Sequence, residues 1–429
     1  MSNNLIDESI DGIFKTELFA RTIFKDLSVL SPHYVPEKLP HRMEHAKSIS
    51  NILAPVVRDE KPNNLFIYGK TGTGKSCVTR YVARKLNEFI KNSNLPVVAK
   101  IIYMNCKIYN TKYQVLKVIA ENNSLNDVEN NLINAPLRDR PDKKLEGMTP
   151  VDLYERIKTV IQDNNINLIL VLDEIDQIKK GDDLKDLTYI LTRSNDELLK
   201  GHVSLIGITN SMKLEKRLDP RSRSTLCEEK MFFKPYNAVE LKDILKQRVE
   251  LGLHEDSIED SSIGYIAAIV AQQHDGDARY ALKILQKSGE ITQQKRELKI
   301  NDAAVESAKE SVEKDIVAES ISALPEHEKM TLYAIAELSE QGSMQRRLAG
   351  VTDGSMFTGE VYDMYQKICQ RLKTSPRTMR MISNYLSGLE MQGFITAQLS
   401  GKYVRGNTRL IKLGYSPKEI KEIIESGWK

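Results

Sequence analysis

The residues with the clearest chemistry form a glycine-rich loop between an apolar run and a helical stretch. Residues 69–76 read Gly-Lys-Thr-Gly-Thr-Gly-Lys-Ser and follow the apolar residues 65–68. Glycines let successive backbone N–H groups turn toward one anion, and a helix beginning near Lys75 adds its positive end. In such loops the lysine reaches the β- and γ-phosphates and the hydroxyl of the last residue ligates Mg²⁺. We therefore predict a nucleoside triphosphate site formed by Thr71, Gly72, Thr73, Gly74, Lys75 and Ser76.

Two carboxylates supply the second half of such a site. Asp173 and Glu174 follow the near-continuous apolar run 166–172, which predicts a buried strand of a parallel sheet. Ligands bind at the carboxyl ends of such strands. There Asp173 would hold Mg²⁺ through water, and Glu174 would orient or deprotonate the attacking water. Asn210 ends a further apolar run, 203–209, and would contact the γ-phosphate or that water, although asparagine also ends strands as a turn residue.

Length and composition indicate the number of domains and the class of protein that carries these sites. A chain of 429 residues predicts about two to three domains. It has no apolar stretch of about 18 residues, and its polar, acidic N-terminus has no signal-peptide pattern, so we expect a cytoplasmic protein without a membrane partner. The four cysteines (Cys77, Cys106, Cys227 and Cys369) are far apart, which favours reduced buried thiols over a metal site or a disulfide framework.

Charge is concentrated near the C-terminal end, although the net charge of the chain is only +3. Segment 312–370 has five basic and ten acidic residues, a difference of −5. Segment 371–409 has seven basic residues against Glu390 alone, a difference of +6. A local basic cluster in a near-neutral chain indicates a face that binds a polyanion.

The same basic segment has the pattern of a winged helix. Ser375 and Pro376 are typical of a helix start and Gly393 of a helix end. Between them an apolar stripe is formed by Met379, Ile382, Leu386 and Leu389. A hairpin should follow, with strands 394–399 and 408–413 around the turn 400–407. The predicted DNA contacts are Arg377 and Arg380 from the helix and Lys402 and Arg405 from the turn. The alternatives are a solvated charged hairpin and a winged helix that docks a protein.

The order of these motifs resembles the AAA+ ATPases, through residues 69–76, Asp173-Glu-Ile-Asp176 and the strand-terminal Asn210. The resemblance implies that Arg279 is the sensor-two arginine at the start of a lid helix. It implies an arginine finger at Arg221, with Arg223 as a rival that the spacing does not exclude. Tyr236 would pack beside the base or ribose with Arg248 nearby, and the loop 34–42, with Val35 and Arg42, would enclose adenine. ATP is favoured over GTP because the sequence has no Asn-Lys-x-Asp guanine motif.

From about Tyr34 to beyond Arg409, the chain resembles the archaeal origin-recognition initiators, relatives of the eukaryotic origin-recognition and cell-division-cycle loaders. The implied fold is an α/β P-loop AAA+ ATPase, a parallel sheet flanked by helices, with an α-helical lid and a C-terminal winged-helix domain. We expect a flexible segment 1–15, a base 16–234, a lid 235–311 and a winged helix 312–429. The implied activity is a weak ATPase that uses ATP/ADP and Mg²⁺ as a switch. The implied partners are double-stranded origin DNA, an MCM-type replicative helicase and other initiator subunits, at the nucleoid.

Other functions share parts of this pattern. A clamp-loader or branch-migration ATPase would have the same phosphate loop and carboxylates. A signalling ATPase would use the winged helix as a transcriptional or protein-docking module. A helicase is disfavoured, because 312–429 shows no alternation of parallel strands and helices. The long segment 105–149, with a helical stretch at 113–122 and a charged run at 137–145, is a surface insertion or, as in replication initiators, a further DNA contact.

Overall fold

The structure, a computed structural model, describes residues 22–93, 95–122, 125, 147–178, 182–211, 214–218, 220–341, 355–399 and 409–428. The segment expected to be flexible (1–15), the charged run 137–145 and the hairpin turn 400–407 lie outside these ranges. The chain divides into two compact units, residues 1–308 and 309–429. Within the described part, no helix is long and apolar enough to cross a membrane.

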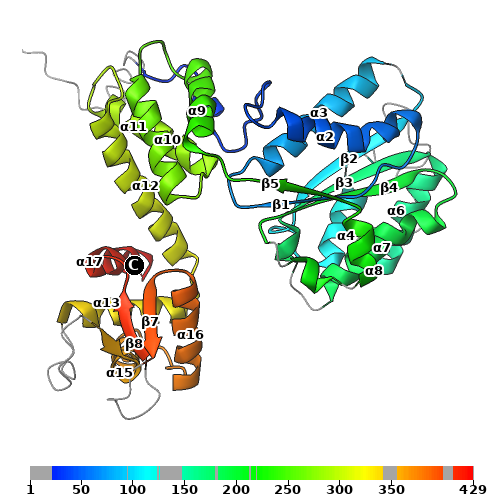
Figure 1. The fold of residues 1–429 in the computed structure, drawn as a ribbon. Coiled ribbons are helices and arrows are strands. Elements are labelled where there is room, and N and C mark those ends of the chain that lie inside the picture. The colour runs from blue at the N-terminus through cyan, green and yellow to red at the C-terminus, as the bar shows by residue number, and fades with distance from the viewer. Residues whose placement is uncertain are drawn as a thin grey trace, which may run out of the picture. The chain divides into compact units, whose positions relative to one another are not determined.

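The first unit contains a five-stranded parallel sheet in the order β2-β3-β4-β1-β5 (Figure 1). The strands are β1 (Leu65–Gly69), β2 (Val98–Asn105), β3 (Ile166–Asp173), β4 (His202–Thr209) and β5 (Glu229–Phe233). The three strands predicted from apolar runs are therefore confirmed. Because β4 lies between β1 and β3, the carboxyl ends that carry the phosphate loop, Asp173 and Asn210 lie at one edge of the sheet.

Helices cover both faces of this sheet (Figure 1). One face carries α2 (Met43–Leu53) and α3 (Lys75–Asn92), and the other carries α4 (Lys112–Glu121), α6 (Pro150–Asp163), α7 (Asp183–Glu197) and α8 (Pro220–Leu226). Short 3₁₀ turns join them at η2 (Ala54–Arg58), η3 (Ile175–Gln177) and η4 (Leu214–Arg217). All eight residues of β3 are buried. Leu168 and Leu170 join one core and Ile169 and Val171 the other, which explains why this strand is apolar without alternation.

A helical lid follows the sheet in the same unit. It consists of α9 (Ala238–Gly252), α10 (Asp260–Gln273), α11 (Ala278–Gln294) and the first part of α12 (Asp302–Ser322). Asn237 and Glu240 form a capping box that starts α9, and the Asp277 carboxylate accepts hydrogen bonds from two backbone N–H groups at the start of α11. Both helices thus begin where polar residues cap an apolar pattern.

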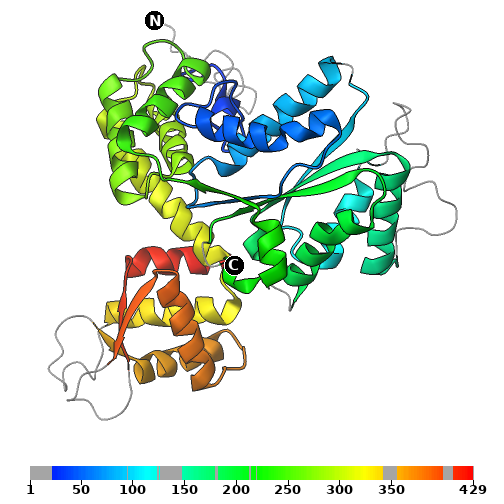
Figure 2. The same cartoon turned by 45° about the vertical axis from the view of Figure 1, so that its right-hand side comes forward.

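Residues 22–42, the N-terminal strap, run beside the lid before they enter the base (Figure 2). The strap contains the 3₁₀ turn η1 (Leu27–Leu30), which packs against α9 and α11. The backbone N–H groups of Lys25 and Asp26 both donate to the Gly252 carbonyl at the end of α9. The strap therefore joins the beginning of the chain to a helix more than two hundred residues away.

The second unit is a helical domain with a small antiparallel sheet. After α12 come α13 (Glu326–Gln341), α15 (Thr358–Arg371), α16 (Met379–Met391) and α17 (Pro417–Trp428). The sheet has the order β6-β8-β7, with β6 at Met356–Phe357, β7 at Ile395–Leu399 and β8 at Arg409–Leu413. The predicted hairpin is confirmed. The strand β6 was not predicted, because two residues are too short to show an alternating pattern.

One expectation for these helices is wrong, and one expected boundary falls inside a helix. The boundary between lid and winged helix, expected at 311–312, lies within α12, which continues from Asp302 to Ser322, since this stretch is rich in helix-forming Ala, Glu and Lys. Ser375 and Pro376 do not start α16, which begins at Met379 with Thr378 as its N-cap. The Arg377 N–H donates instead to the Tyr365 hydroxyl of α15 at 2.9 Å, so residues before Thr378 are held outside the helix.

The end and the core face of α16 agree with the sequence pattern. Gly393 has φ +79°, the left-handed conformation expected at a helix end. Ile382, Leu386 and Leu389 are fully buried, whereas Met379, which was assigned to the same stripe, is 40% exposed. Met379 lies in the first turn, where the helix has not yet reached the core.

Candidate functional site

The phosphate loop is shaped by glycines that approach the lid closely. Gly72 and Gly74 have φ values of +69° and +91°, and α3 begins at Lys75, as predicted. A Cβ on Gly72 would lie 1.8 Å from Asp277 Oδ1, and one on Gly74 would lie 2.6 Å from the Tyr236 hydroxyl. The glycines therefore permit both the turn of the backbone and its contact with residues of the lid.

Lys75 lies at the centre of the site with only 6% of its surface exposed. Its Nζ donates to the carbonyl of Gly69 at 2.8 Å, to that of Lys70 at 2.6 Å and to Asn210 Oδ1 at 2.8 Å. Burial lowers the pKa of Lys75 to about 8, and the neighbouring Asp173 carboxylate opposes this shift. Asn210 therefore reaches the phosphate-loop lysine across the sheet, at the position predicted from the end of β4.

Among the other loop residues, Thr73 stabilises the turn and Ser76 lies at the expected metal site. Thr73 is buried and its hydroxyl donates to the Lys70 carbonyl at 2.9 Å, which stabilises the turn, whereas Thr71 is exposed. Ser76 lines the pocket beside Asp173 and Glu174. A hydroxyl and carboxylates are oxygen donors, the ligand type that Mg²⁺ requires, so this edge of the sheet fits the expected metal.

The two carboxylates after β3 have different environments. Asp173 is 6% exposed, and its Oδ1 accepts a hydrogen bond from the Glu174 N–H at 3.0 Å. The Tyr103 hydroxyl of β2 donates to Asp173 Oδ2. Glu174 has φ +53°, a left-handed conformation that is uncommon for glutamate and turns the chain sharply after the strand. Its side chain is thereby directed to the pocket, whose lining includes it.

A network behind the carboxylates fixes the loop after β3. The Thr209 hydroxyl of β4 donates to Asp176 Oδ1 at 2.6 Å. The Arg217 guanidinium donates to the carbonyls of Asp176 and Ile178 at 2.9 and 2.7 Å. Asp176 thus positions the backbone that carries Glu174.

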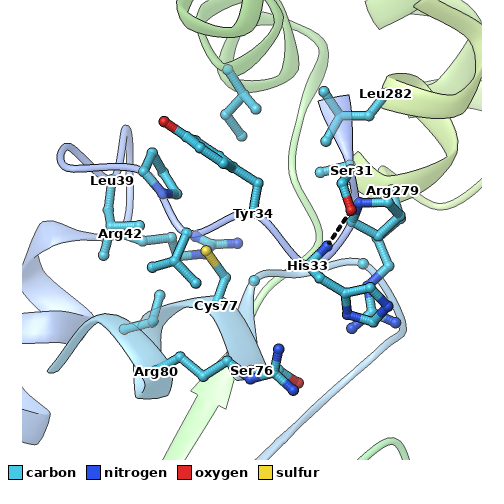
Figure 3. A pocket seen from close by; sticks show the side chains of 18 of the residues that line it. Ser31, His33, Tyr34, Leu39, Arg42, Ser76, Cys77, Arg80, Arg279 and Leu282 are labelled. Carbon is cyan, nitrogen blue, oxygen red and sulfur yellow. Dashed lines mark hydrogen bonds between the residues drawn. The ribbon is translucent and has the colours of Figure 1, made fainter. Parts of the chain in front are cut away.

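A cavity opens beyond the loop, between the base, the lid and the strap (Figure 3). Tyr34, Val35, Leu39 and Arg42 come from the strap, and Tyr236, Ile244, Arg248, Arg279 and Leu282 come from the lid side. An apolar wall with a few buried polar groups is the composition expected of a nucleobase pocket. Every residue predicted around the base lines this cavity.

Arg42 joins three segments around that cavity. It is 4% exposed, and its guanidinium donates to the Thr73 carbonyl at 3.0 Å and to the Lys234 carbonyl at 2.5 Å. Its Cζ lies 3.9 Å from the centre of the Tyr236 ring, within cation–π distance. Arg42 therefore ties the strap to the phosphate loop and to the segment that leads into the lid.

Arg248 of α9 is 5% exposed and lies 4.8 Å from the ring of Tyr34. One of its terminal nitrogens donates to the Val29 carbonyl at 3.4 Å, and its Nε is buried without a hydrogen-bond partner in the described structure. An unpaired buried donor is costly, so this nitrogen fits a site whose ligand brings an acceptor.

The predicted arginines of the lid and of α8 differ in placement. Arg279 is exposed at the start of α11, lines the cavity and lowers the pKa of Lys75 by charge repulsion, so its guanidinium lies near the phosphate loop. Arg221 and Arg223 both fall in α8. Arg223 is exposed and outside the cavity lining, while the side chain of Arg221 lies outside the described part of the chain.

Sequence analysis missed Tyr103 and Arg80. The Arg80 guanidinium of α3 lies 4.3 Å from the Tyr103 ring and lines the cavity. A tyrosine near the end of an apolar strand is usually a core residue, and only the placement of β2 beside β3 brings it to Asp173. The strand order that makes this contact was not predictable from either residue.

In the second unit, Arg377 and Arg380 are exposed at and before the start of α16. Arg409 of β8 donates to the Ser387 hydroxyl of α16 at 2.9 Å and so joins the sheet to this helix. Lys402 and Arg405 lie outside the described residues. The described part of the predicted DNA face is therefore the start of α16.

Sheet, lid, phosphate loop and paired carboxylates together define a P-loop ATPase of the AAA+ class that also has a winged-helix domain. Family models agree: an AAA ATPase domain matches residues 38–206, a Cdc6 AAA+ ATPase-type lid domain matches 242–310, and a CDC6 C-terminal winged-helix domain matches 319–423. The chain belongs to the family of ORC1-type DNA replication proteins, which are replication initiators.

Two curated relatives illustrate the similarity. The ORC1-type DNA replication protein of Thermococcus onnurineus is 38% identical over 418 residues, 97% of this chain and 94% of the relative. That of Pyrococcus abyssi is 39% identical over 415 residues, 96% and 93% of the two chains. Among solved structures, the Aeropyrum pernix ORC1 protein in complex with DNA matches with a TM-score of 0.79 and 32% identity, and covers 94% of this chain and 97% of that one.

Proposed function

We propose that this chain is an ATP-dependent replication initiator that binds origin DNA and recruits or loads a replicative helicase of the MCM type. Its family and its AAA ATPase domain support the general role. The observation that carries the mechanism is the cavity shared by base, lid and strap, which contains the unpaired Nε of Arg248 and adjoins a small pocket at the phosphate loop lined by the buried Lys75. A nucleotide in this cavity would touch both halves of the first unit.

In this proposal each residue of the site has its own role in binding or hydrolysing the nucleotide. Lys75 and Arg279 bind the terminal phosphates, and Arg248 and Tyr236 bind the base and ribose with Tyr34, Val35 and Arg42. Ser76 and Asp173 hold Mg²⁺, which supplies charge neutralisation at the phosphates when bound. Glu174 accepts the proton of the attacking water or orients it, and Asn210 positions the same water.

Hydrolysis would serve as a switch with slow turnover. Arg279 and Arg248 belong to the lid, and Lys75 and Asp173 to the base, so the triphosphate stabilises the closed arrangement by contacting both. Arg221, or else Arg223, on α8 would meet the nucleotide of a neighbouring initiator subunit, because a guanidinium stays charged and can bind phosphate oxygens in a fork.

Nucleotide binding and hydrolysis, measured separately, test the site. Lys75→Ala should lower ATP affinity at least about a hundredfold, because a buried charge that binds the phosphates is lost. Glu174→Gln should keep ATP affinity within about threefold but lower hydrolysis at least about a hundredfold, because the amide cannot accept a proton. Lys91→Ala, an exposed lysine at the end of the same helix, is the control. Hydrolysis by Glu174→Gln at the wild-type rate would refute the base assignment.

The DNA role is tested with sheared DNA from the organism of origin. The protein with ATP should recover a few discrete loci that share a short repeat, and sequence-specific binding of this kind is what an initiator at the nucleoid requires. Arg380→Ala, and Arg405→Ala on the predicted wing, should reduce that enrichment, whereas Lys418→Ala on α17 should not. Uniform recovery would favour a clamp-loader or branch-migration ATPase with only electrostatic affinity. No recovery would favour a signalling ATPase whose winged helix docks a protein, and would contradict origin binding.

A further inference from the structure

Tyr103 places a phenol against Asp173, one of the two side chains proposed to hold the metal. It lies on β2, the edge strand, two residues before Asn105, which is in register with Asp173. Its hydroxyl donates to Asp173 Oδ2. Burial raises the pKa of the phenol, and Ser76 is close enough to the same hydroxyl to lower that pKa by a smaller amount.

This contact occupies the carboxylate that the metal site needs. Asp173 Oδ1 already accepts the Glu174 N–H, and Oδ2 accepts the Tyr103 hydroxyl, so each oxygen has a donor. Mg²⁺ binds hard oxygen ligands in a nearly ideal octahedron at about 2.0–2.1 Å and keeps several of its waters. The waters of such an ion would donate to the carboxylate oxygen that now accepts the phenol. A carboxylate oxygen can accept more than one hydrogen bond, but each added donor weakens the others, so the phenol and these waters would bind Asp173 Oδ2 at each other's expense.

We propose that Tyr103 is a positioning residue that controls access of Mg²⁺ to the nucleotide site. Its hydroxyl holds the Asp173 carboxylate in the absence of the metal, and it releases Asp173 when Mg²⁺ binds. The inference rests on the proposed nucleotide function, which it deepens by naming a residue that sets the metal requirement.

The ring of Tyr103 is held independently of its hydroxyl. The Arg80 guanidinium lies 4.3 Å from the ring centre, and the backbone of β2 is paired with β3 along its whole length. Removal of the hydroxyl alone leaves both contacts, so Tyr103→Phe isolates the competition at Asp173 from any change of fold. Arg80 also lines the nucleotide cavity, whereas Tyr103 is not among the described residues that line it.

The test is a Mg²⁺ titration of nucleotide binding to the full chain, followed with a fluorescent ADP analogue. Tyr103→Phe should lower the Mg²⁺ concentration for half-maximal enhancement of binding by at least about threefold, because a hydrogen bond to a charged group is removed from the competition. Affinity for the analogue in EDTA should stay within about twofold of the wild type, since no nucleotide contact is lost. A purely structural hydroxyl would change both quantities together or neither.

The matched control is Tyr81→Phe. Tyr81 lies on α3, and the cationic groups of Arg84 and Lys85 lie 5.8 and 5.9 Å from the centre of its ring. Tyr81→Phe therefore also removes a hydroxyl from a tyrosine that contacts a cation, but this tyrosine does not bind Asp173. Its Mg²⁺ midpoint should equal that of the wild type. An unchanged or raised midpoint in Tyr103→Phe would overturn the inference while leaving the nucleotide site intact. Failure of the wild type to bind the analogue with or without Mg²⁺ would refute the proposed function as well.

Discussion

At the scale of single residues, the site depends on buried cations whose partners are backbone carbonyls. Lys75 donates to two carbonyls of its own loop, and Arg42 donates to one carbonyl of that loop and to one before the lid. Neither cation forms one of the ion pairs described in the structure, so each keeps a positive charge that a phosphate or a base can meet without first breaking a salt bridge. Burying such charges is expensive unless they are hydrogen-bonded, and the carbonyls provide those bonds.

Arg42→Lys tests this arrangement. A lysine amine cannot donate in a fixed fork to the Thr73 and Lys234 carbonyls while covering the Tyr236 ring. We expect the free energy of unfolding of the first unit to fall by about 2 kcal/mol and nucleotide affinity to fall roughly tenfold, since a hydrogen bond from a charged donor is lost. Urea denaturation and nucleotide titration measure the two effects.

The control for Arg42→Lys is Lys47→Ala. Lys47 pairs with Glu44 at 2.9 Å on the exposed surface of α2, where the side chain of Lys47 is 65% exposed. Such pairs contribute at most about 1 kcal/mol. A lysine at position 42 that left both stability and affinity unchanged would show that the charge alone, and not the planar fork, is required.

At the scale of elements, local sequence patterns predicted the helices and strands themselves better than they predicted the contacts between them. β1, the phosphate loop, α3 and β3 each follow from residues that are adjacent in sequence, so propensity and periodicity were sufficient. The contact of Tyr103 with Asp173 depends on strand order. The late start of α16 depends on the Tyr365 hydroxyl, which binds the Arg377 N–H from another helix. Tertiary hydrogen bonds of this kind have no counterpart in a local pattern.

The packing of the phosphate loop on the lid gives a prediction for Gly72. The Ala278 N–H donates to the Gly72 carbonyl at 3.2 Å, and a Cβ at Gly72 would overlap Asp277. Gly72→Ala should therefore lower the free energy of unfolding by at least about 1–3 kcal/mol, because it combines backbone strain with this overlap. Nucleotide affinity should fall as well, because the loop must move away from the start of α11.

Lys70→Ala separates this steric effect from the charge contact at the same place. Lys70 pairs with Asp275 at 2.7 Å, but both side chains are more than half exposed. Its loss should cost less than about 1 kcal/mol in the same urea denaturation. If Lys70→Ala were as destabilising as Gly72→Ala, the ion pair and not the close backbone approach would hold the loop to the lid.

At the scale of the whole molecule, the chain consists of two compact units that carry different predicted ligands. The nucleotide cavity is built entirely from residues of the first unit, and the described basic residues at the start of α16 belong to the second. Ligands that bind only the native state of one unit stabilise that unit by mass action.

Calorimetry of the intact chain tests this separation. At a free nucleotide concentration about one hundred times Kd, the unfolding free energy of the first unit should rise by about 2.7 kcal/mol, while the transition of the second unit should stay in place. Lys75→Ala, which lacks the phosphate contact, should abolish the shift and so assign the transition. An equal shift of both transitions would mean that the two units unfold as one cooperative body.

The N-terminal strap has a consequence for how the lid can move. When the contact of α11 with the phosphate loop opens, the lid stays connected to the base by the chain segment between β5 and α9, and a second time by the strap, which is bonded to the end of α9 through Gly252 and to the phosphate loop through Arg42. A body attached at two separate places turns most freely about the line that joins them. Loss of nucleotide would therefore change one angle about a fixed axis, rather than release the lid in all directions.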